Sequence, residues 1–238
     1  RFMDDHLKRF MVASSFLTGW PADAGEERDY TPILPYFAVV GAFLGIVSWL
    51  LTYVCLHSLK ESSQAALGAV LVTAGWAYLT RGQNLQSAPG LVERLRGLLS
   101  TSKEAPEPLA PNLLFFGLII LKLVGVGVLL YNKDFNWLVM VPLMSAFFSV
   151  EAGIELEVLP LRASKDMQHR YIMRIAILLF ALICGPKGVF TALFVLMLLL
   201  VMRDWVRRNF SNDAELWING GAELLEVIVL WLGVILLS

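Results

Sequence analysis

The sequence predicts an all-α, polytopic integral membrane protein with about seven transmembrane helices. Hydrophobic residues make up 57% of the 238 residues, charged residues only 16%, and the mean hydropathy is +0.66. A soluble domain would carry about a quarter charged residues, and here the apolar residues come in blocks of roughly bilayer length. The formal net charge of −1 gives no electrostatic case for binding nucleic acid.

We expect residues 1–32 to form an arm at the cytoplasmic membrane surface and residues 33–238 to form a single transmembrane domain. Within the arm, Leu7–Phe16 is predicted to be a short amphipathic segment that ends at Gly19–Pro21. Pro32 and Pro35 suit the start of the first span. The predicted spans lie near residues 33–56, 65–79, 113–131, 135–150, 171–185, 188–202 and 220–237.

Three features refine this outline. Gly41 and Gly45 form a GxxxG pair in the first span, which permits close helix packing. The fourth span is expected to continue as a more polar helix to Pro160. A long cytoplasmic loop is predicted over residues 80–112, with an amphipathic surface helix at Leu91–Leu99 in its middle.

The distribution of Lys and Arg predicts the orientation. Fifteen lie in the N-terminal arm and the segments after the second, fourth and sixth spans, whereas three lie on the other side. By the positive-inside rule the N-terminus and long loops are cytoplasmic and the C-terminus is outside. Because the sequence starts at Arg1 rather than Met, we expect a further N-terminal piece.

Charged residues within spans are the candidates for chemistry, because each costs a few kcal/mol unless paired or hydrated. Lys122 lies in the third span, Glu223 and Glu226 share a face of the last, and Glu151 and Glu155 share a face after the fourth. One interpretation is a buried polar site bridged by a metal or phosphate. The other is an interhelical ion pair of Lys122 with a glutamate, plus interfacial carboxylates. The sequence contains no HExxH, Walker or CxxC motif.

Four ordered segments carry a resemblance to a known family. Ser15–Pro21 reads SFLTGWP, Pro35–Leu51 is an apolar run, Ala65–Leu79 is rich in small residues, and Pro142–Arg162 ends in LPLR. Their order and spacing resemble the cobalamin synthase family, the membrane-bound adenosylcobinamide-GDP ribazoletransferases. The corresponding family segments are an SFLTRLP-type segment, the first span, the span before the active-site loop, and a segment ending in LPYAR.

The last span adds to the resemblance. Asn219–Glu226 (NGGAELLE) is similar to the family's C-terminal GAxxELxE helix, which would place Glu223 and Glu226 on its two glutamates. The resemblance implies transfer of α-ribazole or its phosphate to adenosylcobinamide-GDP, with release of GMP. It also implies Mg²⁺ held by the aspartates of a GGxHLDGxxDxxDG signature, because Mg²⁺ prefers hard, charged oxygen ligands beside phosphates.

The chain departs from that signature. Asn84 stands for the histidine, Gln86 for the first aspartate and Gly90 for the second, and only Glu93 keeps a carboxylate. A second family motif, DSRxGxxG, has no counterpart, because the sequence contains no Asp-Ser dipeptide. A neutral amide cannot replace a carboxylate's charge beside a divalent ion. We therefore expect a divergent member with a degenerate motif, no metal site and no cofactor, with Mg²⁺ only if the family activity is retained.

Three hypotheses stay open at this point. The first is a scaffold that has lost catalysis and serves as a structural or accessory subunit of a larger membrane assembly. The second is an active Mg²⁺-dependent transferase. The third is a transporter or lipid-binding protein with a polar path through Lys122, Glu223 and Glu226. In each case the expected location is the cytoplasmic (inner) membrane of a bacterium or archaeon, with lipids and other membrane subunits as partners.

Overall fold

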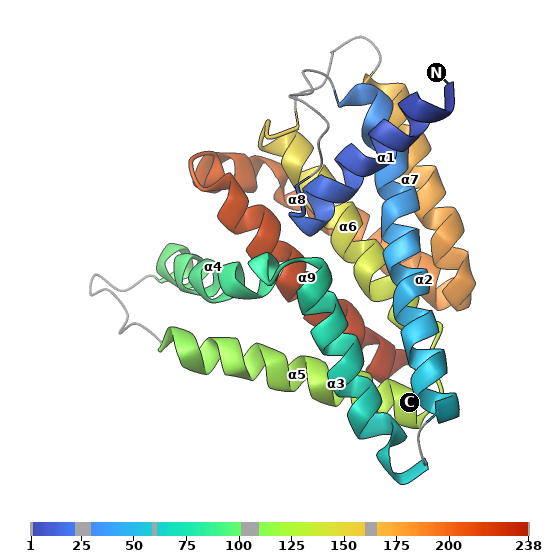
Figure 1. Cartoon of the computed structure of the whole chain (residues 1–238). Helices are drawn as coiled ribbons and strands as arrows, with labels where there is room; N and C mark the ends of the chain where they lie inside the picture. The colour runs from blue at the N-terminus through green and yellow to red at the C-terminus, as the bar shows by residue number, and fades with distance from the viewer. Residues whose placement is uncertain (1, 22–29, 59–60, 101–109, 160–165, 238) are drawn as a thin grey trace.

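The computed structural model describes residues 2–21, 30–58, 61–100, 110–159 and 166–237. These residues form α-helices and two short 3-10 turns, without a strand (Figure 1). The elements are α1 (Phe2–Thr18), η1 (Thr31–Ile33), α2 (Leu34–Ser58), α3 (Glu61–Leu79), α4 (Gln83–Leu99), α5 (Pro111–Tyr131), α6 (Trp137–Glu155), α7 (Asp166–Ala181), η2 (Leu182–Cys184), α8 (Gly185–Phe210) and α9 (Ala214–Leu237).

The protein is an all-α polytopic membrane protein, as the sequence predicts. In the described part of the chain, five elements are long and apolar enough to cross a bilayer: Thr31–Val54, Pro111–Tyr131, Trp137–Glu155, Gln168–Phe210 and Ala214–Leu236. Gln168–Phe210 contains α7, η2 and α8, and Ser63–Leu79 is apolar but shorter. Each of the seven predicted spans falls on a helix. The number that cross the bilayer and their orientation stay predictions.

Helix α6 is the centre of the bundle. Nearly all its side chains are buried, and it packs between α2 and α9. At one end Trp137 is 1% exposed and donates a hydrogen bond from its indole to the carbonyl of Val229, at 2.8 Å. The backbone of α2 comes close to α6 at its two GxxxG positions. A Cβ added at Gly41 would lie 2.9 Å from Ala146 Cβ, and one at Gly45 would lie 2.7 Å from Val139 Cγ1.

Three helices end on the same backbone motif, in which a non-glycine residue takes a left-handed conformation. Arg81 (φ 52°), Lys133 (φ 62°) and Glu157 (φ 61°) follow α3, α5 and α6. In each case the next amide bonds back to a carbonyl five residues earlier, as from Gly82 to Ala77 at 2.7 Å. This is the Schellman arrangement, which satisfies the last free carbonyls of a helix. It ends α6 at Glu155, so the predicted extension to Pro160 is wrong; Pro160 itself lies outside the described residues.

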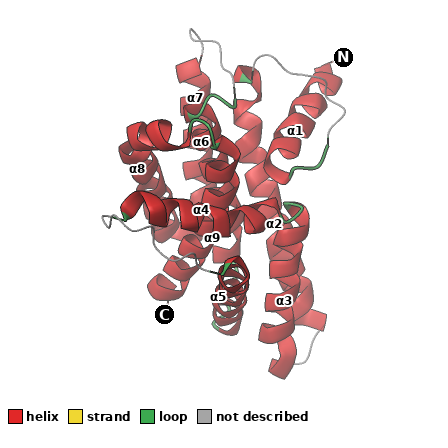
Figure 2. Ribbon diagram, turned by 90° about the vertical axis from the view of Figure 1, so that its left-hand side faces the viewer, coloured by secondary structure: helices red, strands yellow, loops and turns green. Residues whose placement is uncertain are grey.

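The predicted long loop over residues 80–112 is also wrong in its first half. Helix α4 begins at Gln83, eight residues before the expected Leu91, and packs against α9 (Figure 2). Gly220 of α9 makes this packing possible, because a Cβ there would meet Leu91 Cβ at 2.9 Å. Leu91 is fully buried, so α4 is fixed by packing on the bundle rather than by the membrane surface. Residues 101–109, with the expected place of the second family motif, lie outside the described residues.

The outer surface is apolar on the long helices. Leu113 on α5 is 67% exposed, Phe190 on α8 is 66% exposed and Val201 on α8 is 76% exposed. Such a surface is stable only against lipid or another protein chain. Of the two cysteines, Cys184 is half-buried and donates a hydrogen bond to the carbonyl of Asn136, at 2.9 Å.

Candidate functional site

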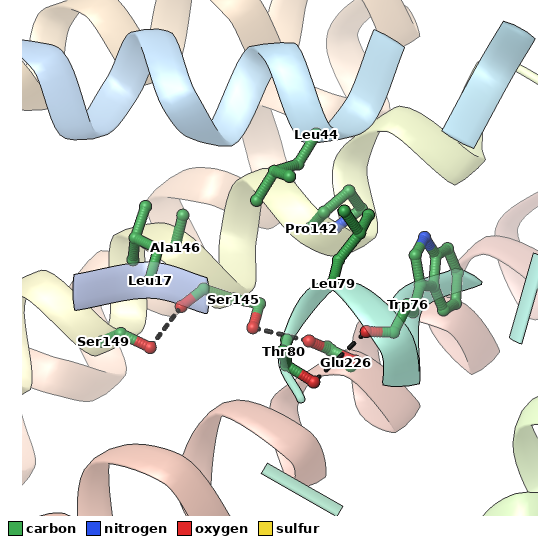
Figure 3. Close-up of a pocket in the computed structure, with 10 residues that line it drawn as sticks. All are labelled: Leu17, Leu44, Trp76, Leu79, Thr80, Pro142, Ser145, Ala146, Ser149 and Glu226. Carbon is green, nitrogen blue, oxygen red and sulfur yellow. Dashed lines mark hydrogen bonds between the residues drawn. The ribbon is translucent and has the colours of Figure 1, made fainter. Parts of the chain in front are cut away.

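The turn between α3 and α4 has one side on a cavity in the bundle and the other side exposed, because Thr80 is half-buried whereas Arg81 and Gln83 are exposed. Thr80 lines a cavity together with Leu44, Ser145 and Glu226, which come from the middle of α2, α6 and α9 (Figure 3). The region that resembles the family's active-site loop therefore starts at the end of α3, where Thr80 faces residues from the middle of three other helices. Leu17 of α1 lines the same cavity.

The end of α1 holds this turn in place. Gly19 has a left-handed φ of +66°, and an added Cβ there would lie 2.3 Å from Gln83 Oε1. Arg81 donates a hydrogen bond to the carbonyl of Gly19 at 3.1 Å, and its guanidinium lies 5.4 Å from the ring centre of Trp20. Trp20 in turn packs against Tyr78. The predicted end of the N-terminal helix at Gly19–Pro21 is thus a contact point for the candidate site.

The motif positions divide between two faces of α4. Gln86, Gly90 and Glu93 follow at i, i+4 and i+7, so they share one face of the helix. Gln86 and Gly90 are exposed and Glu93 is half-buried, 3.7 Å from Arg96. Asn84 lies two residues before Gln86, on the opposite face, and is buried at 7% exposure. The helix therefore keeps Asn84 apart from the other three motif positions.

A buried ionic cluster lies between α5 and α9. Lys122 Nζ is 2.7 Å from Glu223 Oε1 and 2.5 Å from Glu226 Oε2. Lys122 Nζ donates a hydrogen bond to Glu226 Oε2. Its contact with Glu223 Oε1 is an ion pair that does not meet the geometry of a hydrogen bond. Ser145 of α6 donates to the second oxygen of Glu226 at 2.7 Å. All four side chains are buried.

Trp76 closes this cluster on the α3 side. Lys122 Nζ lies 5.8 Å from its ring centre, within the range of a cation–π contact. Its indole N–H donates to Ser48 Oγ on α2 at 2.6 Å, and Ser48 bonds back to its own helix at the carbonyl of Leu44. Helices α2, α3, α5, α6 and α9 are thereby linked around one ammonium group. The interpretation of Lys122 as an interhelical ion pair describes this arrangement, although two glutamates share the lysine.

The cavity beside Glu226 is small, about 30 Å³. This volume holds one or two water molecules. Its polar atoms are the hydroxyls of Thr80, Ser145 and Ser149 and the Glu226 carboxylate (Figure 3). Small-molecule sites typically enclose about 300–1,000 Å³.

The residues do not fit the Mg²⁺ that the family resemblance implies. In the described part of the chain, no three His, Cys, Asp or Glu side chains lie close enough together to hold a metal ion. Glu223 and Glu226 already share an ammonium, which repels a divalent cation. Glu93 lies on a different face from Asn84 and pairs with Arg96. We derive no step through a metal.

A second ionic cluster joins the ends of α6, α7 and α8. Glu151 is 2% exposed and receives bonds from Arg170 and from Arg174, the latter at 2.7 Å. Glu155 receives a bond from Arg170 at 2.6 Å, and Arg203 Nε lies 2.7 Å from its other oxygen. Arg207 Nε lies 3.3 Å from the same oxygen of Glu155 as Arg203 does. Sequence reasoning identified the two glutamates but missed all four arginines, as it missed Ser145 and Trp76.

Comparison with known proteins adds one finding. Residues 9–88 match the family described as cobalamin-5-phosphate synthase. The resemblance to the cobalamin synthase family is confirmed over these residues. They cover about a third of the chain, from α1 to the first turns of α4, and so include Asn84 and Gln86 but neither Glu223 nor Glu226. No curated protein and no solved structure matches the chain.

Proposed function

We propose that this cobalamin-synthase-like membrane protein has lost the family's transfer reaction and serves as a structural or accessory subunit of a larger membrane assembly. The observation that carries the proposal is Lys122, whose ammonium lies within ion-pair distance of both Glu223 and Glu226. These are the glutamates that the resemblance places on the family's C-terminal helix. The proposed location is the cytoplasmic (inner) membrane of a bacterium or archaeon, without a metal or other cofactor.

Charge and space both support this proposal. A divalent ion beside two phosphates needs several carboxylate ligands, and Gln86 and Gly90 supply no charge. The two glutamates that the resemblance places on the family's C-terminal helix, Glu223 and Glu226, already share the ammonium of Lys122. A corrinoid nucleotide is also many times larger than the cavity of about 30 Å³ beside Glu226.

The main alternative is an active ribazoletransferase, which the match of residues 9–88 favours. The test is expression in a bacterium whose own cobalamin synthase has been deleted, with an authentic family member as the positive control. We expect membrane-inserted protein but no cobalamin-dependent growth. Growth above the empty-vector level refutes the loss of catalysis.

The accessory role has its own test, because loss of activity does not establish it. After gentle solubilisation from its native membrane, we expect the protein in a complex with a second membrane chain in fixed stoichiometry. Recovery of this chain alone, across several mild detergents and after cross-linking in intact cells, refutes that role. The outcome is independent of the growth assay.

The transporter hypothesis is less well supported. Lys122 is 5% exposed and contacts both glutamates, and the cavity that reaches Glu226 is about 30 Å³. A polar path for a solute needs hydrated groups and free space. A Lys122-dependent solute flux in reconstituted vesicles would favour this hypothesis over the accessory role.

A further inference from the structure

The cluster at the ends of α6, α7 and α8 has an excess of positive charge. It is made of three pairs of residues spaced four apart: Glu151 and Glu155 on α6, Arg170 and Arg174 on α7, and Arg203 and Arg207 on α8. Four guanidinium groups face two carboxylates. No other carboxylate in the described part of the chain is paired with these arginines. The nearby acidic side chains of Asp204 and Glu157 are exposed.

The four arginines differ in exposure and in how much of each guanidinium is used. Arg170 and Arg174 have side chains 19% and 17% exposed, and both use two nitrogen atoms on the glutamates. Arg203 and Arg207 are both 44% exposed and reach Glu155 through Nε alone. Their terminal Nη groups have no partner among the described residues. The excess charge therefore lies on these two outer arginines.

The outer arginines lie at the border of the apolar surface. Val201, two residues before Arg203, is 76% exposed, whereas the chain from Arg203 to Arg208 is rich in charge. On α7, Tyr171 directly follows Arg170 and is 52% exposed. A basic cluster at such a border lies at the depth of phospholipid headgroups.

An apolar groove begins one helical turn from Arg203. It encloses about 130 Å³ between α4, α6, α8 and α9, and its walls carry no exposed polar surface. Leu199 lines it and lies four residues before Arg203, on the same face of α8. Phe148 of α6 and Ile228 of α9 form other parts of its wall.

We propose that Arg203 and Arg207 bind a phosphate group, and that an anionic phospholipid with a chain in the adjacent groove supplies it. A guanidinium presents paired N–H donors that match two phosphate oxygens. Two outer arginines, held by Glu155 through Nε, leave their terminal donors for this purpose. A soluble phosphate ester offers the same oxygens but gains nothing from the groove, so the two sources are separable by experiment.

The test uses the full chain in a non-ionic detergent. Bound ligand is counted by native mass spectrometry during titration with phosphatidylglycerol, with phosphatidylcholine and with inorganic phosphate. We expect saturable binding of phosphatidylglycerol, weaker binding of phosphatidylcholine, and little inorganic phosphate. A direct hydrogen bond to a charged group contributes about tenfold in affinity, so Arg203→Gln with Arg207→Gln, which removes one such bond or more from each arginine, should weaken phosphatidylglycerol binding by about 100-fold.

Arg208→Gln is the matched control, because Arg208 is exposed and its Nε bonds only to the carbonyl of Asp204. The affinity of the Arg208→Gln variant for phosphatidylglycerol should stay within about twofold of that of the parent protein. If the double glutamine variant fails to fold, Arg203→Lys with Arg207→Lys keeps the charge but removes paired donation, and should still weaken binding severalfold. Arginine-dependent binding of inorganic phosphate as tight as that of lipid supports the phosphate site and overturns its lipid source. Binding that these substitutions leave unchanged overturns the site.

Discussion

Replacing Lys122 with methionine tests the ionic cluster most directly. Methionine has nearly the length and shape of the lysine stem, so packing against Trp76 is kept while the ammonium is lost. Glu223 and Glu226, which are 2% and 5% exposed, then have no cation within the described contacts. The expected result is a large loss of stability, because two buried carboxylates on one helix face cannot both stay ionised without a partner.

The magnitude follows from buried ion pairs in general. Removal of one partner from such a pair costs about 3–5 kcal/mol, because the remaining charge is left buried. For a chain of this size each kcal/mol lowers the melting temperature by about 2–4 °C. We therefore expect Lys122→Met to melt roughly 6–20 °C below the parent protein in the same detergent. The assay is thermal unfolding followed by circular dichroism and by size-exclusion chromatography.

Two further variants separate charge from packing. Lys133→Met removes an exposed lysine and should melt within a degree or two of the parent. Glu226→Gln added to Lys122→Met removes one of the stranded carboxylates and should recover part of the lost stability. A Lys122→Met variant that melts with the parent, or a double variant less stable than the single one, refutes the role of the ammonium as the internal counter-ion.

Three other substitutions and one control test the surrounding structure by the same unfolding assay. Glu151→Gln should cost about 2–3 kcal/mol, since the partly exposed arginines around it lose a shared carboxylate; no change would contradict the ion pairing. Gly233→Ala should cost roughly 1–3 kcal/mol, because the added Cβ would lie 2.1 Å from the Trp137 ring. Gly117→Ala, with no atom within 4 Å of the added Cβ, is its neutral or slightly stabilising control. Trp76→Phe should cost about 1–2 kcal/mol through loss of its indole hydrogen bond, and parent-like stability would contradict that bond's contribution.

The fold class followed from the low charged fraction and the length of the apolar blocks, since a bilayer admits few backbone structures other than helices. Each predicted span falls on a helix for this reason. The helix ends were less accurate, because they depend on local backbone motifs. The left-handed conformations of Arg81 and Glu157 have no reliable sequence signal, since neither is glycine.

Helix α4 was predicted incompletely for a different reason, because its formation depends on tertiary packing rather than on a local backbone motif. Residues 83–90 are polar enough to resemble a loop and contain Pro89, which disfavours a helix interior. The helix forms because Ala88 and Leu91 are fully buried, with Leu91 packed against Gly220 of α9, more than a hundred residues later in the chain. Tertiary burial therefore outweighed local preference. The sequence pattern predicted a helix only over Leu91–Leu99, and without the position of α9 it had no basis for a start at Gln83.

The second ionic cluster could have been predicted in part. The pairs Glu151/Glu155, Arg170/Arg174 and Arg203/Arg207 each repeat at four residues, which puts both members on one helix face. Equal spacing on three helices that end on the same predicted side of the membrane indicates contact. The sequence prediction used these arginines only to orient the protein in the membrane, so it did not identify their contact with the two glutamates.

The cluster around Lys122 was harder to predict from residue spacing, but its two glutamates have a strict physical requirement for a cation. Glu223 and Glu226 lie on one face of a helix in the bundle interior, where two carboxylates need a cation whatever else the protein does. A metal ion or a basic side chain meets this requirement, and in the described part of the chain Lys122 is the basic group that contacts them. The lysine is fixed to the chain and carries one charge, so it stabilises the helices without offering a phosphate a site. On this argument the neutral residues at Gln86 and Gly90 and the lysine in α5 have the same effect: each lowers the capacity of the scaffold to hold a divalent ion, and only the lysine also holds the bundle together.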